Sequence, residues 1–209
     1  MHNRTVRILR ILAITAYMFG CSMAATGQDV FSIYSRMSPP SPASGNGAQV
    51  GIGFDGVMGI GSSIFFDVDA SAIREPKGYV GDGWTLRSQA EVNVRILPAI
   101  WIGGGWSASR HSNSSYAKAQ YQPLISAHYR PSPVADIYVT GLLPANGNQN
   151  QVRGYRIGYR GSLLMSVDKR WGMFSQVEYN DFWFQDAFLL NHRAQSVTVG
   201  LGLSYIKQR

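Results

Sequence analysis

Apolar and polar residues alternate along most of this chain, most strictly between residues 194 and 206. Every second residue there is apolar, and the residues between are small or polar. A β-strand turns successive side chains to opposite faces, whereas a helix would spread the same apolar residues around its circumference. The segment is therefore predicted to be a strand with one apolar face. The residues of that face are Val197, Val199, Leu201, Leu203 and Tyr205.

The same alternation recurs upstream and predicts eight strands, each bounded by residues that favour turns. Their connections are alternately long and short, which is typical of an up-and-down antiparallel arrangement. The predicted strands cover about 48–70, 84–97, 99–110, 118–130, 134–144, 153–168, 173–186 and 194–206.

The first predicted strand, 48–70, contains Asp55-Gly56, a pair that suits either a hairpin turn or a bulge within one long strand. We predict one strand, because an even number keeps both ends of the chain on the side of the short turns. A loop is expected over 71–83, where proline and glycine are frequent. Residues 29–37 suit either an additional short strand or an ordered plug.

The N-terminal residues 1–24 have the features of a secretory signal peptide, with a basic start, a short apolar core and small residues before an expected cleavage after Ala24. Cys21 is either a lipidation site or an inert residue of this leader. Residues 25–47 include a Pro-, Ser- and Gly-rich stretch that predicts a flexible spacer. The strand-rich domain is then expected over 48–209.

Composition narrows the class of protein. Charged residues make up 15% of the chain, against about 25% in an average soluble domain, whereas aromatic residues reach 12%. No apolar run approaches the roughly 20 residues of a membrane-spanning helix, so this chain could cross a bilayer only as a closed barrel. Beyond residue 28 there are 16 basic residues (19 minus three leader arginines) against 12 acidic ones, with no basic stripe that would indicate a nucleic-acid partner. The single cysteine excludes an intrachain disulfide.

The alternation shows that the two faces differ, but it does not show which face is inside. A membrane barrel turns its apolar face to lipid, whereas a secreted soluble barrel of the lipocalin kind turns it inward around a ligand. We predict the membrane barrel, because the apolar faces carry more large aromatic side chains than one small lumen can pack. Aromatic residues near strand ends would then form interfacial girdles. The predicted girdle residues are Trp84, Trp101, Trp106, Tyr121, Tyr129, Trp171, Trp183 and Tyr205.

The last predicted strand places Thr198, Gly200, Leu203 and Tyr205 at the polar, glycine, hydrophobic and aromatic positions of a short motif. The motif resembles the C-terminal β-signal that the outer-membrane barrel-assembly machinery recognises, although four residues follow Tyr205 here. With its leader, the chain resembles small outer-membrane barrels of the OmpA-transmembrane-domain or OmpX architecture. That resemblance implies an all-β fold, a monomeric eight-stranded antiparallel up-and-down transmembrane β-barrel, inserted by this machinery among outer-membrane lipids.

The polar faces of the predicted strands would line the lumen of such a barrel, and they carry charges of both signs. Isolated buried charge is costly, so these residues are expected to pair and to fill the lumen. The alternative is a narrow ion-conducting pore lined by the same side chains. The predicted lumen charges are Arg87, Glu91, Arg95, His128, Arg130, Asp136, Arg156, Arg160 and Glu178.

The residues support no catalytic or metal site. His111 and Ser112 are adjacent in the sequence at the start of a predicted loop, which does not suit a nucleophile and its base. His128 has no acid partner that the sequence identifies, and the 4 histidines are dispersed without the spacing of metal ligands. We therefore expect no enzymatic activity and no cofactor, and a structural or surface-interaction role instead.

Overall fold

The computed structural model describes residues 28–39, 48–78, 81–111, 120–144, 152–166, 168–185 and 191–207. The predicted signal peptide with Cys21 lies outside these ranges, as do residues 25–27 and 40–47 of the spacer predicted over 25–47. Within the described ranges, no helix has both the length and the apolar character needed to cross a membrane.

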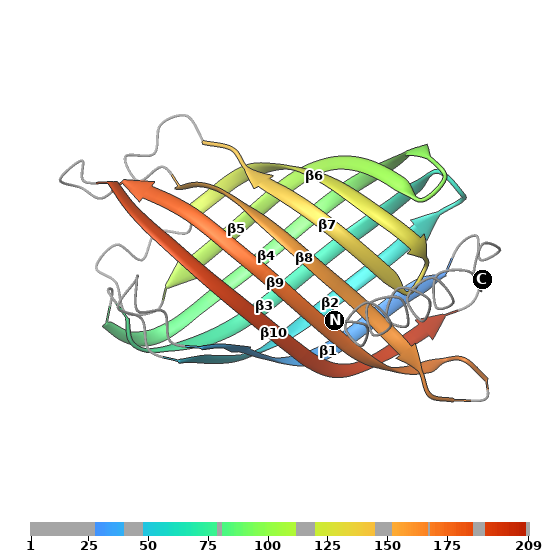
Figure 1. Ribbon diagram of the computed structural model, residues 1–209, viewed down its shortest axis with the longest axis horizontal. Coiled ribbons are helices and arrows are strands. Elements are labelled where there is room, and N and C mark those ends of the chain that lie inside the picture. Colours follow the sequence, from blue (N-terminus) through green and yellow to red (C-terminus); the bar gives the residue numbers. More distant parts are fainter. Residues whose placement is uncertain are drawn as a thin grey trace, which may run out of the picture.

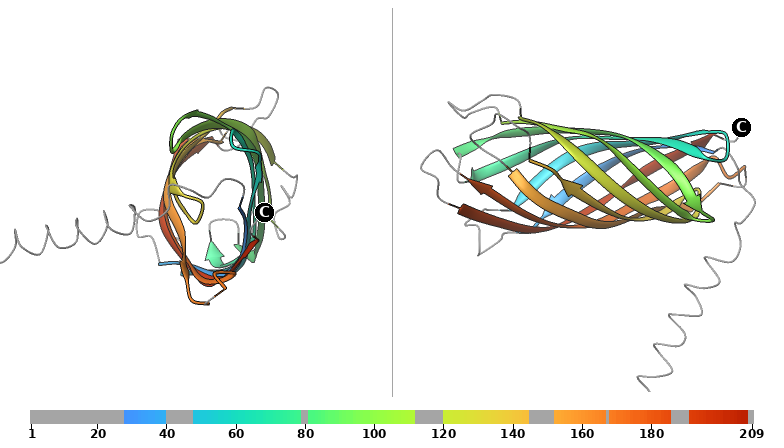
Figure 2. Two further views of the ribbon diagram at one scale, coloured as in Figure 1. Left: turned by 90° about the vertical axis from the view of Figure 1, so that its right-hand side faces the viewer. Right: turned by 90° about the horizontal axis from the view of Figure 1, so that it is seen from above.

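The described residues form ten antiparallel strands that close into one barrel (Figure 1). Each strand pairs with its neighbours in sequence, and β1 pairs with β10 to complete the ring. The end-on view in Figure 2 shows the sheet surrounding a single lumen. The predicted all-β, up-and-down antiparallel barrel is therefore confirmed. The strands are β1 (Asp29–Ser38), β2 (Gln49–Ile60), β3 (Ile64–Gly78), β4 (Gly81–Leu97), β5 (Ile100–His111), β6 (Gln120–Ser132), β7 (Ala135–Leu142), β8 (Val152–Leu164), β9 (Trp171–Gln185) and β10 (Asn191–Lys207).

The predicted count of eight strands is wrong, first because residues 48–70 do not form a single strand. β2 ends at Ile60 and β3 begins at Ile64, after a tight turn in which Gly61 has a φ of 63°. That left-handed conformation suits glycine, which has no Cβ to clash with the backbone. Asp55, expected at a turn or a bulge, instead lies inside β2 and is buried in the lumen.

The second additional strand is β1. Residues 29–37, for which the sequence allows a strand or a plug, join the sheet between β2 and β10. The barrel therefore begins at Asp29 rather than at residue 48. Because both changes add one strand, the number stays even, and the two ends of the strand-forming chain remain at the same end of the barrel.

The loop predicted over 71–83 is also wrong, because β3 and β4 pair through most of that range. A register shift between Glu75 and Gly78 accommodates Pro76, whose missing N–H group would interrupt a regular ladder. At the opposite end of the barrel, turns of two or three residues join β2 to β3, β4 to β5 and β6 to β7. We call that end, which also contains Asp29 and Lys207, the turn end, and the other the loop end.

The apolar face of the sheet points outward and the polar face points into the lumen. On β10, Leu201 is 57% exposed, whereas Ser204 on the other face is 0% exposed. The same division holds on β7, where Ile137 and Val139 are exposed and Asp136 and Thr140 are buried. The alternative arrangement, in which the apolar face turns inward as in lipocalin-like barrels, is therefore wrong for the described strands.

Tyr34 of β1 is a large side chain in the lumen whose position depends on neighbouring glycines. It lies opposite Gly53 of β2 and Gly202 of β10, and its ring packs against Phe174 with the ring centres 5.0 Å apart. Its hydroxyl donates a hydrogen bond to Asp69 at 2.7 Å. A Cβ added to Gly53 would overlap the Tyr34 ring. Glycine at this position therefore makes room for the ring.

Replacing Gly53 with valine is expected to destabilise the barrel by about 1–3 kcal/mol, the usual cost of overpacking a filled interior. The free energy of unfolding in detergent, measured by urea titration, checks this expectation. The matched control is Gly141→Ala, because a Cβ at Gly141 meets its nearest neighbour, Ile125, at an ordinary 3.5 Å. Equal stability of the two variants would contradict the role assigned to Gly53.

Candidate functional site in the barrel lumen

The lumen contains a group of paired charges centred on Arg160 of β8. Its guanidinium contacts Asp55 of β2 at 2.6 Å and Asp136 of β7 at 2.7 Å. It also forms a two-point pair with Asp67 of β3. All four side chains are buried. Because β8 lies far around the ring from β2 and β3, this one arginine connects opposite walls of the barrel.

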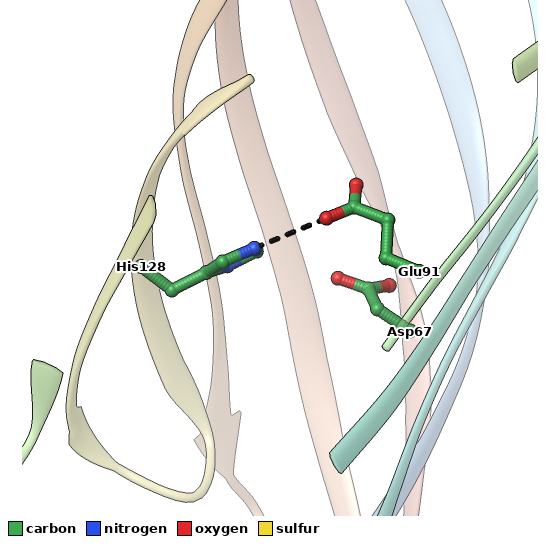
Figure 3. Close-up of side chains that lie close together, drawn as sticks. All are labelled: Asp67, Glu91 and His128. Carbon is green, nitrogen blue, oxygen red and sulfur yellow. Dashed lines mark hydrogen bonds and ion pairs between the residues drawn. The ribbon is translucent and has the colours of Figure 1, made fainter. Parts of the chain in front are cut away.

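His128 of β6 lies beside this group, between two carboxylates. Its Nδ1 is 3.0 Å from Asp136 Oδ2, and its Nε2 is 3.4 Å from Glu91 Oε2. Figure 3 shows Glu91 and Asp67 projecting toward the imidazole. Since both ring nitrogens face carboxylates, a protonated imidazolium donates on both sides. The expectation that His128 has no acid partner is wrong, because its partners come from strands that only the closed barrel brings together.

A second group of polar contacts surrounds Glu178 of β9. Arg36 Nη2 donates a hydrogen bond to Glu178 Oε1 at 2.7 Å, and the Tyr138 hydroxyl donates to Oε2 at 2.9 Å. Gln176 Nε2 donates to the Tyr138 oxygen at 2.9 Å. The two groups meet at Tyr138, because the guanidinium carbon of Arg160 lies 5.3 Å from the centre of the Tyr138 ring.

Gln89 of β4 extends the first group toward Arg156 of β8. Its side-chain oxygen accepts a hydrogen bond from Arg156 Nη1 at 2.6 Å, and its side-chain nitrogen donates to Glu91. Arg156 and Arg87 also lie near the Phe182 ring, at 5.9 Å and 5.8 Å from its centre. We call the described charged side chains that face the lumen, with the polar groups bonded to them, the lumen network.

The charges of the lumen network balance. The carboxylates are Asp55, Asp67, Asp69, Glu91, Asp136 and Glu178, and the basic groups are Arg36, Arg87, Arg130, Arg156, Arg160 and His128. With the imidazole protonated, six negative charges meet six positive ones. Burying ions costs free energy unless they are paired and hydrogen-bonded, and this arrangement meets both conditions for most of them.

Most of the predicted lumen charges belong to this network, and Arg95 does not. Arg95 follows the inward alternation of β4 but is exposed at the turn end, where it bonds the Ser62 carbonyl oxygen at 3.0 Å. Arg130 lies in the lumen near the same end, 4.4 Å from the centre of the Phe65 ring, and donates to the Pro133 carbonyl oxygen at 2.9 Å. The remaining predicted charges also face the lumen. They are Arg87, Glu91, His128, Asp136, Arg156, Arg160 and Glu178.

Several members of the network are absent from the sequence-based set. Asp55 is missing from the predicted lumen charges because a hairpin or bulge is expected at its position. Asp67 is missing because it lies in the same segment, 48–70, which is predicted to be one strand. Arg36 and Tyr34 belong to β1, which the sequence leaves ambiguous. Inward alternation along 29–37, 49–57 and 64–73 is the signal that identifies all of them.

The predicted girdle residues lie on the outer wall, with the exception of Trp101. Its ring points into the lumen, where it packs edge-on against Phe65 with ring centres 4.9 Å apart. At the turn end, Trp171 and Tyr205 form an outward pair at 5.1 Å. The other outward aromatic residues of the predicted set are Trp84, Trp106, Tyr121, Tyr129 and Trp183.

The four residues of the predicted assembly signal divide between the two faces of β10. Thr198 and Gly200 are buried in the lumen, whereas Leu203 is exposed on the outer wall beside Tyr205. Thr198 Oγ1 and Ser38 Oγ are hydrogen-bonded at 2.7 Å across the β1–β10 seam. The motif therefore lies on the strand that closes the barrel.

Among the described residues, the one group that could supply three metal ligands lies near His128. One ligand atom each from Asp67, Glu91 and His128 lie within 4.8 Å of one another. Asp136 holds the other ring nitrogen of His128, as a supporting carboxylate does in many metal sites. Both Asp67 oxygens, however, already accept hydrogen bonds from Arg160, which fills the cation position. The arrangement therefore suits a charge network better than a metal site. The side chain of His111 and all of Ser112 lie outside the described residues.

No protein-family model matches the chain, and no curated protein sequence does so either. Among solved structures, a chain from work on the in-meso crystallization of membrane proteins is similar at 11% identity and a TM-score of 0.39, covering 88% of this chain and 83% of that one. The siderophore receptor PirA from Pseudomonas aeruginosa is similar at 12% identity and a TM-score of 0.33. The match covers 89% of this chain but 37% of the receptor. These similarities do not place the chain in a family.

Proposed function

We propose that this protein is a monomeric barrel that spans an outer membrane, with the lumen network closing its interior. The observation that carries the proposal is the outer wall, which exposes large apolar side chains on every described strand except β3, whose outward Phe66 and Val68 are half-buried. Contiguous apolar surface of this extent is rare on soluble monomers. A closed sheet also satisfies all of its ladder hydrogen bonds internally, as a lipid environment requires.

The interior supports a structural or surface-interaction role rather than catalysis or bulk transport. Side chains of the lumen network bridge the walls at two levels, through Arg160 and through Glu178. The cavity beside Asp55, Arg160 and Phe174 has a volume of about 20 Å³, which holds about one water molecule. On this proposal the barrel reaches the membrane through the barrel-assembly machinery, and its loop end faces outward from the cell.

Membrane fractionation tests the location. The full chain, expressed in a bacterium with an outer membrane, is expected in the outer-membrane fraction and to migrate faster on a gel before heating than after, because a folded barrel resists detergent unfolding. Recovery of the protein in the soluble periplasm would contradict the proposal. Protease cleavage at the loop end in intact cells would support the predicted orientation.

Planar-bilayer recordings separate a filled barrel from a narrow pore. The purified protein is expected to insert without stable conductance steps, because the paired charges leave little continuous aqueous path. Reproducible steps of one size would favour the ion-conducting alternative instead. A variant with Arg160→Ala and Asp67→Ala, which removes a bridge between opposite walls while keeping the charge balance, is expected to raise the leak above the wild-type level.

A further inference from the structure

The described arginines on the outer wall of the strands lie near one end of the barrel, the loop end. Arg74 of β3, Arg110 of β5, Arg153 of β8 and Arg193 of β10 all point outward, and each lies within a few residues of the loop end. Farther from the loop end, the outer wall is mainly apolar, as the exposed side chains of Ile157, Val177 and Val197 illustrate. Among the outward side chains that the structure describes near the loop end, Asp181 is the only carboxylate.

Two of these arginines flank a tryptophan across three neighbouring strands. Trp183 of β9 is directly opposite Arg153 of β8 and directly opposite Arg193 of β10. Adjacent strands are about 4.8 Å apart, so the two arginine positions are separated by roughly 10 Å. The Arg193 guanidinium carbon lies 5.0 Å from the centre of a Trp183 ring, within the range of a cation–π contact. We call these three residues the rim row.

The outward residues two positions farther from the loop end on β9 and β10, Asp181 and Gln195, hold Arg193 in its orientation. Asp181 Oδ1 and Oδ2 accept hydrogen bonds from its Nε at 2.9 Å and its Nη2 at 2.6 Å. Gln195 Nε2 donates to Asp181 at 3.1 Å and to the Tyr179 hydroxyl at 2.7 Å. The Tyr155 hydroxyl is also 3.4 Å from Asp181 Oδ2. Asp181 itself is 0% exposed, while 53% of the Arg193 side chain remains accessible.

We propose that the rim row binds the phosphate group of an anionic lipid headgroup. Guanidinium groups recognise phosphate oxygens through paired N–H donors, and tryptophan favours the headgroup zone of a bilayer. The row lies on the outer wall, above the exposed apolar side chains of Ile157 and Val197, where acyl chains of the same lipid would pack. A lipid therefore fits the surface better than free phosphate. This inference rests on the proposed insertion in a membrane.

Native mass spectrometry of the folded protein in neutral detergent tests the proposal, with phosphatidic acid as the probe and diacylglycerol of the same acyl chains as its phosphate-free match. Wild-type protein is expected to retain phosphatidic acid about thirtyfold more tightly than diacylglycerol. The pair of substitutions Arg153→Gln and Arg193→Gln is expected to remove about that factor, since each basic residue near an anionic headgroup contributes about 1 kcal/mol. Diacylglycerol binding should be unchanged.

The matched control is the pair Lys169→Gln and Lys207→Gln, which removes the same charge from the turn end and should leave phosphatidic acid binding as in wild type. The pair Arg153→Lys and Arg193→Lys keeps the charges and should retain part of the preference if the glutamine variant does not fold. Equal phosphatidic acid binding by wild type and the glutamine variant would overturn the proposal, as would equally effective competition by inorganic phosphate. A barrel that enters neutral vesicles but shows no phosphate preference would leave the proposed function standing. Failure to enter any bilayer would refute both.

Discussion

Replacing Arg160 with alanine is expected to lower the free energy of unfolding by about 3–5 kcal/mol, the usual cost of removing one partner from a buried ion pair. Arg160 contacts Asp55 and Asp136 directly and forms a two-point pair with Asp67. Without the guanidinium, three buried carboxylates lose their shared partner on strands β2, β3 and β7. Their repulsion and incomplete solvation are the physical reason for the large effect.

Urea unfolding of the detergent-solubilised barrel, followed by tryptophan fluorescence, measures this loss. Arg170→Ala is the matched control, because Arg170 is 62% exposed in a turn and its contact with Asp168 is 3.9 Å long. Surface pairs of that kind contribute at most about 1 kcal/mol. Arg160→Lys should fall between wild type and Arg160→Ala, since lysine keeps the charge but cannot form the two-point pair. A loss below about 1 kcal/mol for Arg160→Ala would show that the lumen network does not hold the walls together.

Introducing a charge into the middle of the outer wall is expected to destabilise the membrane-inserted barrel by a comparable free energy, but for a different reason. Leu201 is 57% exposed and lies midway along the apolar face of β10, between Val199 and Leu203. Arginine near the bilayer midplane of an outer-membrane barrel costs about 2–4 kcal/mol. Leu201→Arg is therefore expected to reduce folding into vesicles by at least tenfold, measured as the heat-modifiable fraction on a gel.

The same substitution near the loop end provides the control. Leu143 follows β7 and is 39% exposed on the outer wall, at the height where the wall meets the headgroups in the proposed orientation. Arginine at an interface costs only about 0–1 kcal/mol. If Leu143→Arg and Leu201→Arg impair insertion equally, the apolar wall is not a lipid-facing surface. In that event another hydrophobic partner must cover it.

The sequence predicts which residues of the lumen network face inward, but it does not predict which of them pair. Alternation places Arg160, His128 and Asp136 on polar faces, and that assignment needs nothing beyond the local pattern. The pairing of Arg160 with Asp55 and Asp67 depends on the number of strands and on how the sheet closes. Since those partners are separated by 105 and 93 residues in the chain, no local pattern predicts the contacts.

The number of strands itself was decided by two short segments. The turn between β2 and β3 contains Gly61 in a left-handed conformation. Asp55-Gly56 is also a pair that favours hairpin turns, so the local sequence does not show which of the two sites forms the turn. The segment 29–37 alternates over only a few residues, which also suits a plug. The local sequence is compatible with either structure in both places. The closed sheet determines which one forms, because each strand edge must pair with a neighbouring strand.

By itself, the sequence determined that this chain forms antiparallel strands with one apolar and one polar face. It also marked residues 194–206 as a strand, which became β10. A period of two is a local property, so it survives without knowledge of any partner. Only the tertiary structure decided that the apolar face is outside, that ten strands close the ring, and that Arg160 and His128 meet their carboxylates. Those outcomes depend on contacts between distant strands, and the alternation within a single strand is the same whichever way the sheet curls.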